Sequence, residues 1–172
     1  MQRPISDWAG NIAAFALVIT MNVVSNALPL NGQTKAEISA SYASLFTPAG
    51  FTFSIWGVIY VALLVFVIWQ ALPAQRSSEK VAGLSAYFKA NCLANALWLV
   101  VWHYDLLAIS LIVMLAILAT LILIYRRLIT AIDSAPFSEH LVLYMPFSLY
   151  TGWITLATIC LLYTSPSPRD SY

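Results

Sequence analysis

The sequence has very little charge. Of its 172 residues, eight are Lys or Arg and seven are Asp or Glu, which is 9% of the chain, whereas a soluble domain has about 25%. Apolar residues make up 61%, and the mean hydropathy is +0.82. Because so few charges cannot cover the surface of a soluble fold, the composition predicts a membrane protein. The net charge of +1 provides no basic surface for nucleic acid, so no such partner is expected.

Residues that bind metals or carry out acid–base chemistry are scarce too. The two cysteines and two histidines form no CxxC, HExxH or paired spacing, which argues against a metal site. His103 and His140 lie at the ends of different apolar segments, and Asp105 is better suited to a turn than to catalysis. The apolar segments contain no acidic residue, which argues against an ion-coupled pump. We therefore expect a protein that is not an enzyme, with no catalytic residues and no required cofactor.

Long apolar runs, in contrast, recur five times along the chain. Each is about 20 residues long, which is the length of a helix that crosses the hydrocarbon core of a bilayer. The expected fold is therefore all-α, an integral membrane bundle of five transmembrane helices. These helices are predicted at about residues 8–28, 50–72, 83–102, 106–125 and 140–159.

The connections between the runs predict the orientation. Alternation of the helices puts most basic residues on one side, whereas the other side has only Lys35, in the long 30–47 connection, within the first four spans. Cytoplasmic loops are enriched in Lys and Arg, so we expect the N-terminus to be cytoplasmic, in a bacterial cytoplasmic membrane. The basic residues on that side are Arg3, Arg76, Lys80, Arg126 and Arg127, with Lys89 close to it.

The C-terminal residues leave the helical pattern in mid-span. The eleven residues CLLYTSPSPRD, at 160–170, match the translation of a common transposase-type sequencing adapter. We interpret residues 160–172 as read-through of that adapter rather than native sequence, with a genuine disordered tail as the alternative. On this interpretation the membrane domain covers residues 1–159 and its fifth helix is truncated.

Polar residues inside the predicted spans indicate which helix faces point into the bundle. Asn91, Asn95, Trp98 and Trp102 follow spacings of 4, 3 and 4, which puts them on one helix face. Asn is costly in lipid without a partner. For Asn95 and Trp98, hydrogen bonding between helices and lining of a pocket both stay open, and Trp102 alone also fits an interfacial aromatic belt. Helix–helix polar contacts are predicted for Asn22, Asn26 and Asn91.

Aromatic rings from three predicted helices fall in the same half of the membrane. The stretch FTPAGFTFSIWGVIY, residues 46–60, opens the second span, the third span ends on that side, and the fifth contributes rings from mid-depth. Gly57 would let a helix or a ligand approach the backbone closely, and Pro146 should kink the fifth helix. We predict a site for a flat apolar ligand beneath the 30–47 connection. Its residues are Phe51, Phe53, Trp56, Tyr60, Asn95, Trp98, Trp102, Tyr150 and Trp153.

Three of these stretches resemble motifs of the tryptophan-rich sensory protein and translocator protein family (TspO/MBR, the peripheral benzodiazepine receptor). TPAGFTFSIWGVIY resembles the Pro- and Trp-rich entry to the family's second helix, ANALW its Leu-Asn-x-x-Trp motif, and PFSLYTGWIT its fifth-helix Pro-Tyr-x-x-Trp motif. The chain resembles a divergent branch, with the second proline of the first motif replaced around Ser54 and Ile55. The resemblance implies binding of porphyrin or haem-like tetrapyrroles, sterols or aromatic drugs between helices. It also implies a homodimer, and raises porphyrin degradation as an activity.

Two other classes of function stay open on the sequence alone. One is a membrane scaffold or regulatory subunit without a small ligand, and the other is the N-terminal fragment of a longer transporter. A ligand-binding protein should have a concave aromatic site, whereas a scaffold should have Asn95 and Trp98 packed against neighbouring helices. The favoured hypothesis is a multi-pass membrane protein that binds a tetrapyrrole or sterol in its sensing or transport.

Overall fold

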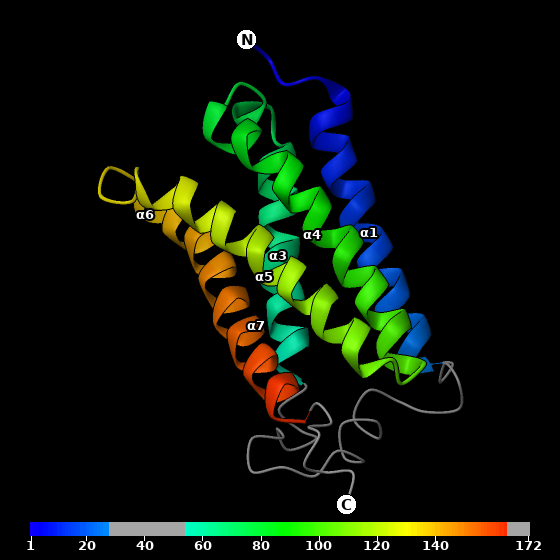
Figure 1. The fold of residues 1–172 in the computed structure, drawn as a ribbon. Coiled ribbons are helices and arrows are strands. Elements are labelled where there is room, and N and C mark those ends of the chain that lie inside the picture. The colour runs from blue at the N-terminus through cyan, green and yellow to red at the C-terminus, as the bar shows by residue number, and fades with distance from the viewer. Residues whose placement is uncertain (28–53, 165–172) are drawn as a thin grey trace, which may run out of the picture.

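The computed structural model describes residues 1–27 and 54–164, without the side chains of Asn26 and Thr164. All regular structure in these residues is helical (Figure 1). The helix α4 packs against both α1 and α5, and α7 packs against α5 and α3. The elements are α1 (Ile5–Ala27), α3 (Ile55–Ala71), the 3-10 turn η3 (Pro73–Gln75), α4 (Glu79–His103), α5 (Leu107–Ile129), α6 (Phe137–Glu139), the π-turn η4 (His140–Tyr144) and α7 (Met145–Thr164).

Among the described residues, four helical segments are long and apolar enough to cross a membrane. They are α1, α4, α5 and the continuous run of α6, η4 and α7. The fifth apolar helix, α3, has 17 described residues, and residues 50–53 of the second predicted span lie outside the described part. The bundle of five apolar helices is therefore present, with α3 the shortest.

The helices extend beyond the apolar runs because capping residues, not hydropathy, set their ends. The predicted span 83–102 corresponds to a helix that begins at Glu79, where the side chain of Ser78 accepts a hydrogen bond from the Val81 amide at 3.3 Å. This is a helix N-cap, which stabilises the first turn. Likewise α5 continues past Tyr125 to Ile129, with Arg126 and Arg127 in its last turn. Their positive charges interact favourably with the negative, C-terminal end of the helix dipole.

A tight turn makes α4 and α5 antiparallel neighbours. The amide of Leu106 donates to the Val101 carbonyl at 3.1 Å, the bond that closes a Schellman motif. Asp105 occupies the left-handed position of this motif, with φ of 59°, where Gly is usual. The turn fixes the end of α4 that carries Trp98 and Trp102 against the start of α5.

The expected kink near Pro146 takes the form of a π-turn just before it. The amide of Met145 bonds to the His140 carbonyl, five residues back, and the helix then regains α geometry through Pro146. Proline has no amide hydrogen to give to the preceding turn, and π-turns accommodate such a break. The α7 helix then continues past Ile159 to Thr164.

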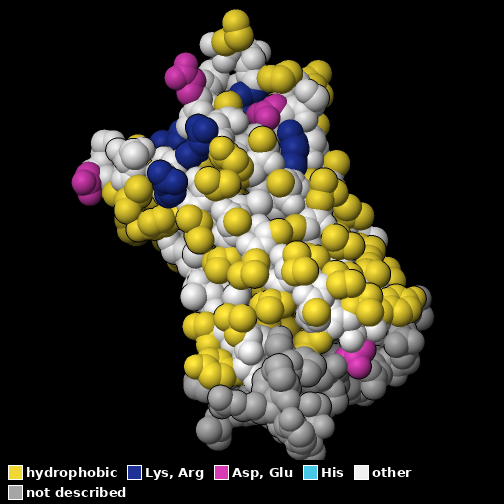
Figure 2. Space-filling model, in the orientation of Figure 1, with side chains coloured by type: hydrophobic (Ala, Val, Ile, Leu, Met, Phe, Trp, Pro, Cys, Tyr) yellow, Lys and Arg dark blue, Asp and Glu magenta, His cyan; other side chains and the backbone are white. Residues whose placement is uncertain are grey.

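The centre of the bundle is apolar, and so is most of its outer surface. Phe66, Phe88 and Phe147, from α3, α4 and α7, meet edge to face with centroids 5.0–6.1 Å apart. Figure 2 shows hydrophobic side chains around the middle of the molecule, while Lys and Arg gather near the end that carries the N-terminus. We call this the basic end. Such a surface suits a helix bundle in a bilayer.

Candidate functional site

Trp56, in the first turn of α3, lies at the centre of a set of aromatic rings. Its ring stacks on Tyr60 at 5.5 Å between centroids and lies 6.3 Å from Trp98 of α4. It also meets Tyr150 and Trp153 of α7 edge to face, at 6.0 and 6.2 Å. Trp98 in turn stacks on Trp102 at 5.4 Å. We call these residues the aromatic cluster: Trp56, Tyr60, Trp98, Trp102, Tyr150 and Trp153.

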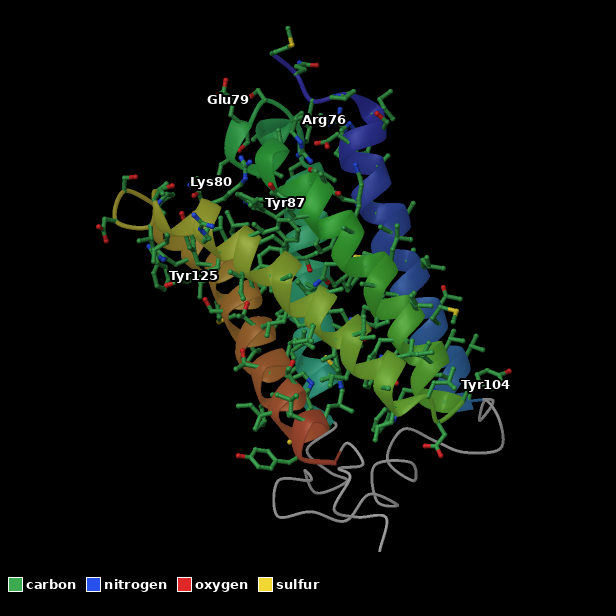
Figure 3. All side chains as sticks on the ribbon, in the orientation of Figure 1. Arg76, Glu79, Lys80, Tyr87, Tyr104 and Tyr125 are labelled. Atoms are coloured by element: carbon green, nitrogen blue, oxygen red, sulfur yellow. The ribbon has the colours of Figure 1, made fainter. Side chains whose placement is uncertain are left out.

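Helical spacing and the antiparallel order of the helices bring this cluster together. Each helix contributes two rings three or four residues apart, so each pair shares a face. The cluster lies toward the start of α3 and the end of α4, near the end of the molecule marked by Tyr104 and away from Arg76 and Lys80 (Figure 3). Trp102 is only 6% exposed, so its ring packs within the bundle rather than on the outer surface.

A chain of hydrogen bonds runs beside the rings and joins three helices. The Asn95 amide nitrogen donates to the Tyr150 hydroxyl at 2.6 Å, and this hydroxyl donates to Asn91 Oδ1 at 3.0 Å. The Asn91 amide nitrogen then donates to Thr120 Oγ1 of α5, also at 3.0 Å. Sequence reasoning missed Thr120, because a single Thr in an apolar run gives no signal until the α4–α5 pairing is known.

Two polar atoms in the aromatic cluster's wall lack hydrogen-bond partners. Asn95 Oδ1 and Trp98 Nε1 are buried and have none among the described residues. Their side chains are 2% and 4% exposed. Buried polar groups are nearly always paired, and leaving one unpaired costs about 1–3 kcal/mol. The site thus offers one acceptor and one donor, on adjacent turns of α4, beside a set of large rings.

The other predicted residues are placed as follows. Phe51 and Phe53 lie outside the described residues, as does the side chain of Asn26. Asn22 lies half-buried on α1. Gly57 is exposed, and a methyl group there would meet no described atom within 4 Å. No described helix approaches Gly57, which is exposed and faces away from the rings, so the expected close approach of a helix or a ligand stays a prediction.

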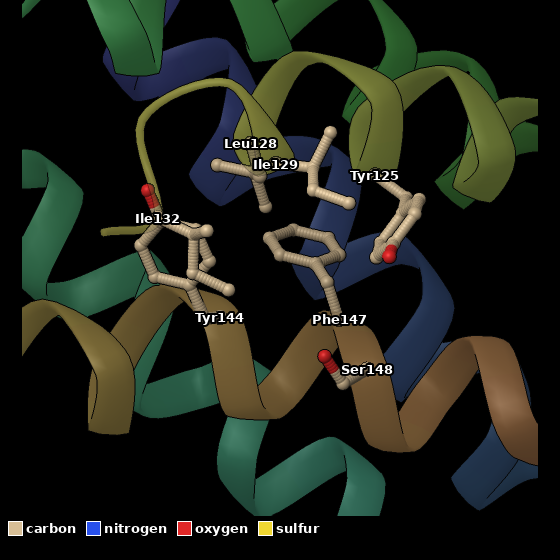
Figure 4. Close-up of a pocket in the computed structure, with 7 residues that line it drawn as sticks. All are labelled: Tyr125, Leu128, Ile129, Ile132, Tyr144, Phe147 and Ser148. Carbon is tan, nitrogen blue, oxygen red and sulfur yellow. The ribbon is translucent and has the colours of Figure 1, made fainter. Parts of the chain in front are cut away.

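A small gap lies between α5 and the segment where η4 joins α7, and it does not overlap the predicted site. It encloses about 20 Å³, roughly enough for one water molecule. Figure 4 shows its aromatic and aliphatic lining, which consists of Tyr125, Leu128, Ile129, Ile132, Tyr144, Phe147 and Ser148. This gap is too small for an organic ligand.

A second buried polar group, at the basic end, was also missed. All five N–H groups of Arg3 have acceptors, on Asp7, Gln70, Gln75 and Ser85. The Gln70 side chain donates to the carbonyls of Trp8 and Val67 and accepts from both Arg3 and Asn11. We call Arg3, Asp7, Asn11, Gln70 and Ser85 the Arg3 network. The isolated Asn11 and Gln70 in apolar runs were its only sequence signal.

Metal-binding groups are also absent from the described part of the chain, where no three His, Cys, Asp or Glu side chains come together. What the aromatic cluster and the adjoining Asn95 provide is a set of ring faces, one unpaired acceptor and one unpaired donor.

The chain was compared with models of known protein families, with curated proteins and with solved structures. The model of the TSPO-like protein family matches residues 7–164, which includes all described residues of the aromatic cluster. No match was found among curated proteins or among solved structures.

Proposed function

The chain belongs to the TSPO-like protein family of membrane proteins, and we propose that it binds a flat apolar ligand of the tetrapyrrole or sterol class between α3, α4 and α7. The ligand would be sensed or moved rather than chemically changed. The proposal makes Trp56 and Trp98 the main stacking surfaces and Asn95 the group that orients the ligand.

The observation that supports this proposal is the pair of unpartnered polar atoms beside the rings. A helix bundle that needed only packing would gain nothing from leaving Asn95 Oδ1 and Trp98 Nε1 buried without partners, since apolar side chains would fill the space at less cost. A ligand carrying a polar N–H or a carbonyl or carboxylate oxygen could pair with them. A tetrapyrrole has both kinds of group and a face that stacks on indole.

Binding can be tested by titrating protoporphyrin into the detergent-purified full chain and following the porphyrin absorbance band. Removal of a buried aromatic anchor typically costs about 2 kcal/mol, or thirtyfold in Kd. Trp98→Ala and Trp56→Ala should each weaken binding by about that factor. Trp69→Ala, near the other end of α3, is the matched control and should bind like the unaltered protein. Equal affinities in all three variants, with helicity intact by circular dichroism, would exclude the site.

Asn91 and Asn95 allow a second, sharper comparison. Both bond to Tyr150, but Asn91 uses its oxygen and its nitrogen within the protein, whereas Asn95 leaves its oxygen unpaired. Asn95→Leu should therefore weaken porphyrin binding with a modest fall in melting temperature. Asn91→Leu should lower the melting temperature more and leave affinity for the remaining folded protein nearly unchanged. The reverse pattern would mean that Asn95 serves packing alone. A sterol titrated against bound porphyrin tests the second ligand class.

A scaffold without a small ligand is the second candidate, and the burial of the site favours it. Asn95 and Trp98 are almost fully enclosed, and the Tyr150 hydroxyl bonds joining α4 to α7 are what helix–helix contacts require. On this reading the chain would hold a partner protein rather than a ligand. Absence of saturable binding for both porphyrin and sterol would favour it.

A further inference from the structure

An apolar groove runs along the outer surface between α1 and α3. It holds about 340 Å³ of space and is separate from the aromatic cluster. Its walls are aliphatic except for one phenyl ring and one hydroxyl, so it fits hydrocarbon better than water. The lining residues are Ile12, Phe15, Ala16, Ile19, Thr20, Leu64, Val67 and Ile68.

A cation lies at the end of the same two helix stripes that form this groove. On α1, residues 12, 16 and 20 lie on one helix face, and Trp8 precedes them on the same face by one turn. The guanidinium of Arg76 lies 4.5 Å from the Trp8 ring centroid. On α3 the stripe of residues 64, 67 and 68 leads to Ala71, whose carbonyl accepts from Arg76 Nε at 3.4 Å. Arg76 thus contacts α1 and α3 at Trp8 and Ala71, about one turn beyond the lining of the groove on each helix.

The charge of Arg76 is not neutralised by a carboxylate in the described structure. The ion pairs there join Arg3 to Asp7, Lys80 to Glu139, and Lys89 to Asp7. Arg76 Nε is engaged, while its Nη atoms, which form the fork that recognises phosphate, have no partner among described residues. Figure 3 shows Arg76 at the basic end of the bundle.

The length of the groove matches one leaflet of a bilayer. The groove's lining on α1 runs from Ile12 to Thr20, a rise of about 12 Å at about 1.5 Å per residue, against about 15 Å for half of a hydrocarbon core about 30 Å thick. Trp8, with Arg76 on its ring, lies one further turn toward the basic end. A molecule with an anion at the membrane surface and a hydrocarbon chain directed inward would contact Arg76 with its anion and fill the groove with its chain.

We propose that this groove is a binding site for one anionic glycerophospholipid from the leaflet at the basic end. The phosphate and negative headgroup bind Arg76, and one acyl chain lies between α1 and α3. The site is independent of the ligand proposed for the aromatic cluster. It would anchor α1, and with it the Arg3 network, to the remainder of the bundle.

The test measures lipid retention by native mass spectrometry of the full chain, released from micelles containing dioleoylphosphatidylglycerol or dioleoylphosphatidylcholine. A cation near an anionic lipid surface contributes about 1 kcal/mol, which is about fivefold in affinity. Arg76→Gln should therefore weaken phosphatidylglycerol binding about fivefold and change phosphatidylcholine binding little. Arg126→Gln is the matched control, since Arg126 is an exposed arginine near the same end, on α5, and should have no effect.

Filling the groove tests the acyl-chain part of the proposal. Ala16→Phe and Thr20→Phe place a ring in the groove and should each weaken retention of both lipids, whereas Ala116→Phe, on the exposed face of α5, should not. Because all three positions are exposed, the variants should fold, which circular dichroism checks. Equal losses from Arg76→Gln and Arg126→Gln would show that the attraction is diffuse, and unchanged retention in both groove variants would remove the site. Light scattering that shows a dimer broken by Ala16→Phe, with lipid retention intact, would assign the groove to a second copy of the chain instead.

Discussion

Replacement of Arg3 should destabilise the whole bundle although this residue precedes the first helix. Arg3→Met removes the charge and keeps most of the length. In the unaltered protein, the Arg3 side chain makes its three shortest hydrogen bonds to residues of α1 and α3. The acceptors are Asp7 Oδ2 at 2.6 Å, the Gln70 side chain at 2.7 Å and the Gln70 carbonyl at 2.9 Å. The Arg3 side chain is 2% exposed, so water cannot replace these bonds.

The loss of unfolding free energy in Arg3→Met depends on which hydrogen bonds its former partners keep. Breaking a buried ion pair by removing one partner costs about 3–5 kcal/mol. Asp7 keeps the Ser85 hydroxyl, and the Gln70 side chain keeps Asn11, so the lower end, about 3 kcal/mol, is expected. For a chain of this length about 1 kcal/mol shifts the melting temperature by about 2–4 °C, which gives a fall of about 6–12 °C.

Thermal unfolding in detergent, followed by far-ultraviolet circular dichroism, measures this shift. Arg126→Met is the control, because Arg126 is exposed and no described carboxylate pairs with it; its melting temperature should stay within about 1–2 °C of the unaltered protein, as for other surface changes. A double-mutant cycle with Gln70→Leu should show coupling of about 1–2 kcal/mol, as expected for residues in one hydrogen-bonded network. If Arg3→Met had the same melting temperature as Arg126→Met, the stabilising role of the Arg3 network would be refuted. If the free-energy changes of Arg3→Met and Gln70→Leu were strictly additive, the coupling between Arg3 and Gln70 would be refuted.

Three further predictions concern other parts of the fold. Tyr150→Phe should destabilise by about 2 kcal/mol, because it leaves Asn91 Oδ1 and Asn95 Nδ2 without the hydroxyl between them; an unchanged melting curve would contradict this. Asp105→Gly should raise stability by about 1 kcal/mol, because Gly adopts the observed φ of 59° without steric cost; a lower melting temperature would mean that the Asp105 side chain matters more than its backbone. Cysteines introduced at Ser78 and Tyr104, at opposite ends of α4, should differ in labelling by an impermeant thiol reagent on intact cells, with only position 104 reached; labelling at 78 alone would reverse the predicted orientation.

Hydropathy predicted the presence of the helices well because each helix has apolar side chains both in the core of the bundle and on its outer surface. It placed their ends less well because the ends depend on single polar atoms. The Ser78 hydroxyl and the Arg126–Arg127 pair extend α4 and α5 beyond the apolar windows. The π-turn before Pro146 likewise follows from a missing amide hydrogen, which predicts a distortion at that place but not its type.

The motifs predicted the family, and the match over residues 7–164 confirms it. They also named the rings that the structure brings together on α3, α4 and α7, because helical spacing fixes which residues share a face. Gly57 lies on a different face from the rings for the same reason: it adjoins Trp56 in sequence, but a neighbour in sequence points about 100° away around a helix. Thr120 and the Arg3 network depend on which helices pack together, which one sequence read alone does not give.

The two buried polar groups of the bundle differ in how fully their hydrogen bonds are made. At the basic end, Arg3 and the Gln70 side chain use every donor, and Asn11 Oδ1 is the one acceptor of the Arg3 network without a described partner. Outside that network, the buried Tyr144 hydroxyl near Lys80 also lacks a hydrogen-bond partner among the described residues. Toward the other end, such an atom is found on Asn95, Trp98, His103 and Ser110. At about 1–3 kcal/mol each, so many unmade bonds in one region are a large burden for a fold that is stable by about 5–15 kcal/mol. A bound molecule that supplies the missing partners would remove part of that cost. The aromatic end is therefore where a ligand would gain most hydrogen-bond partners, whereas the Arg3 network already makes nearly all of its bonds within the bundle.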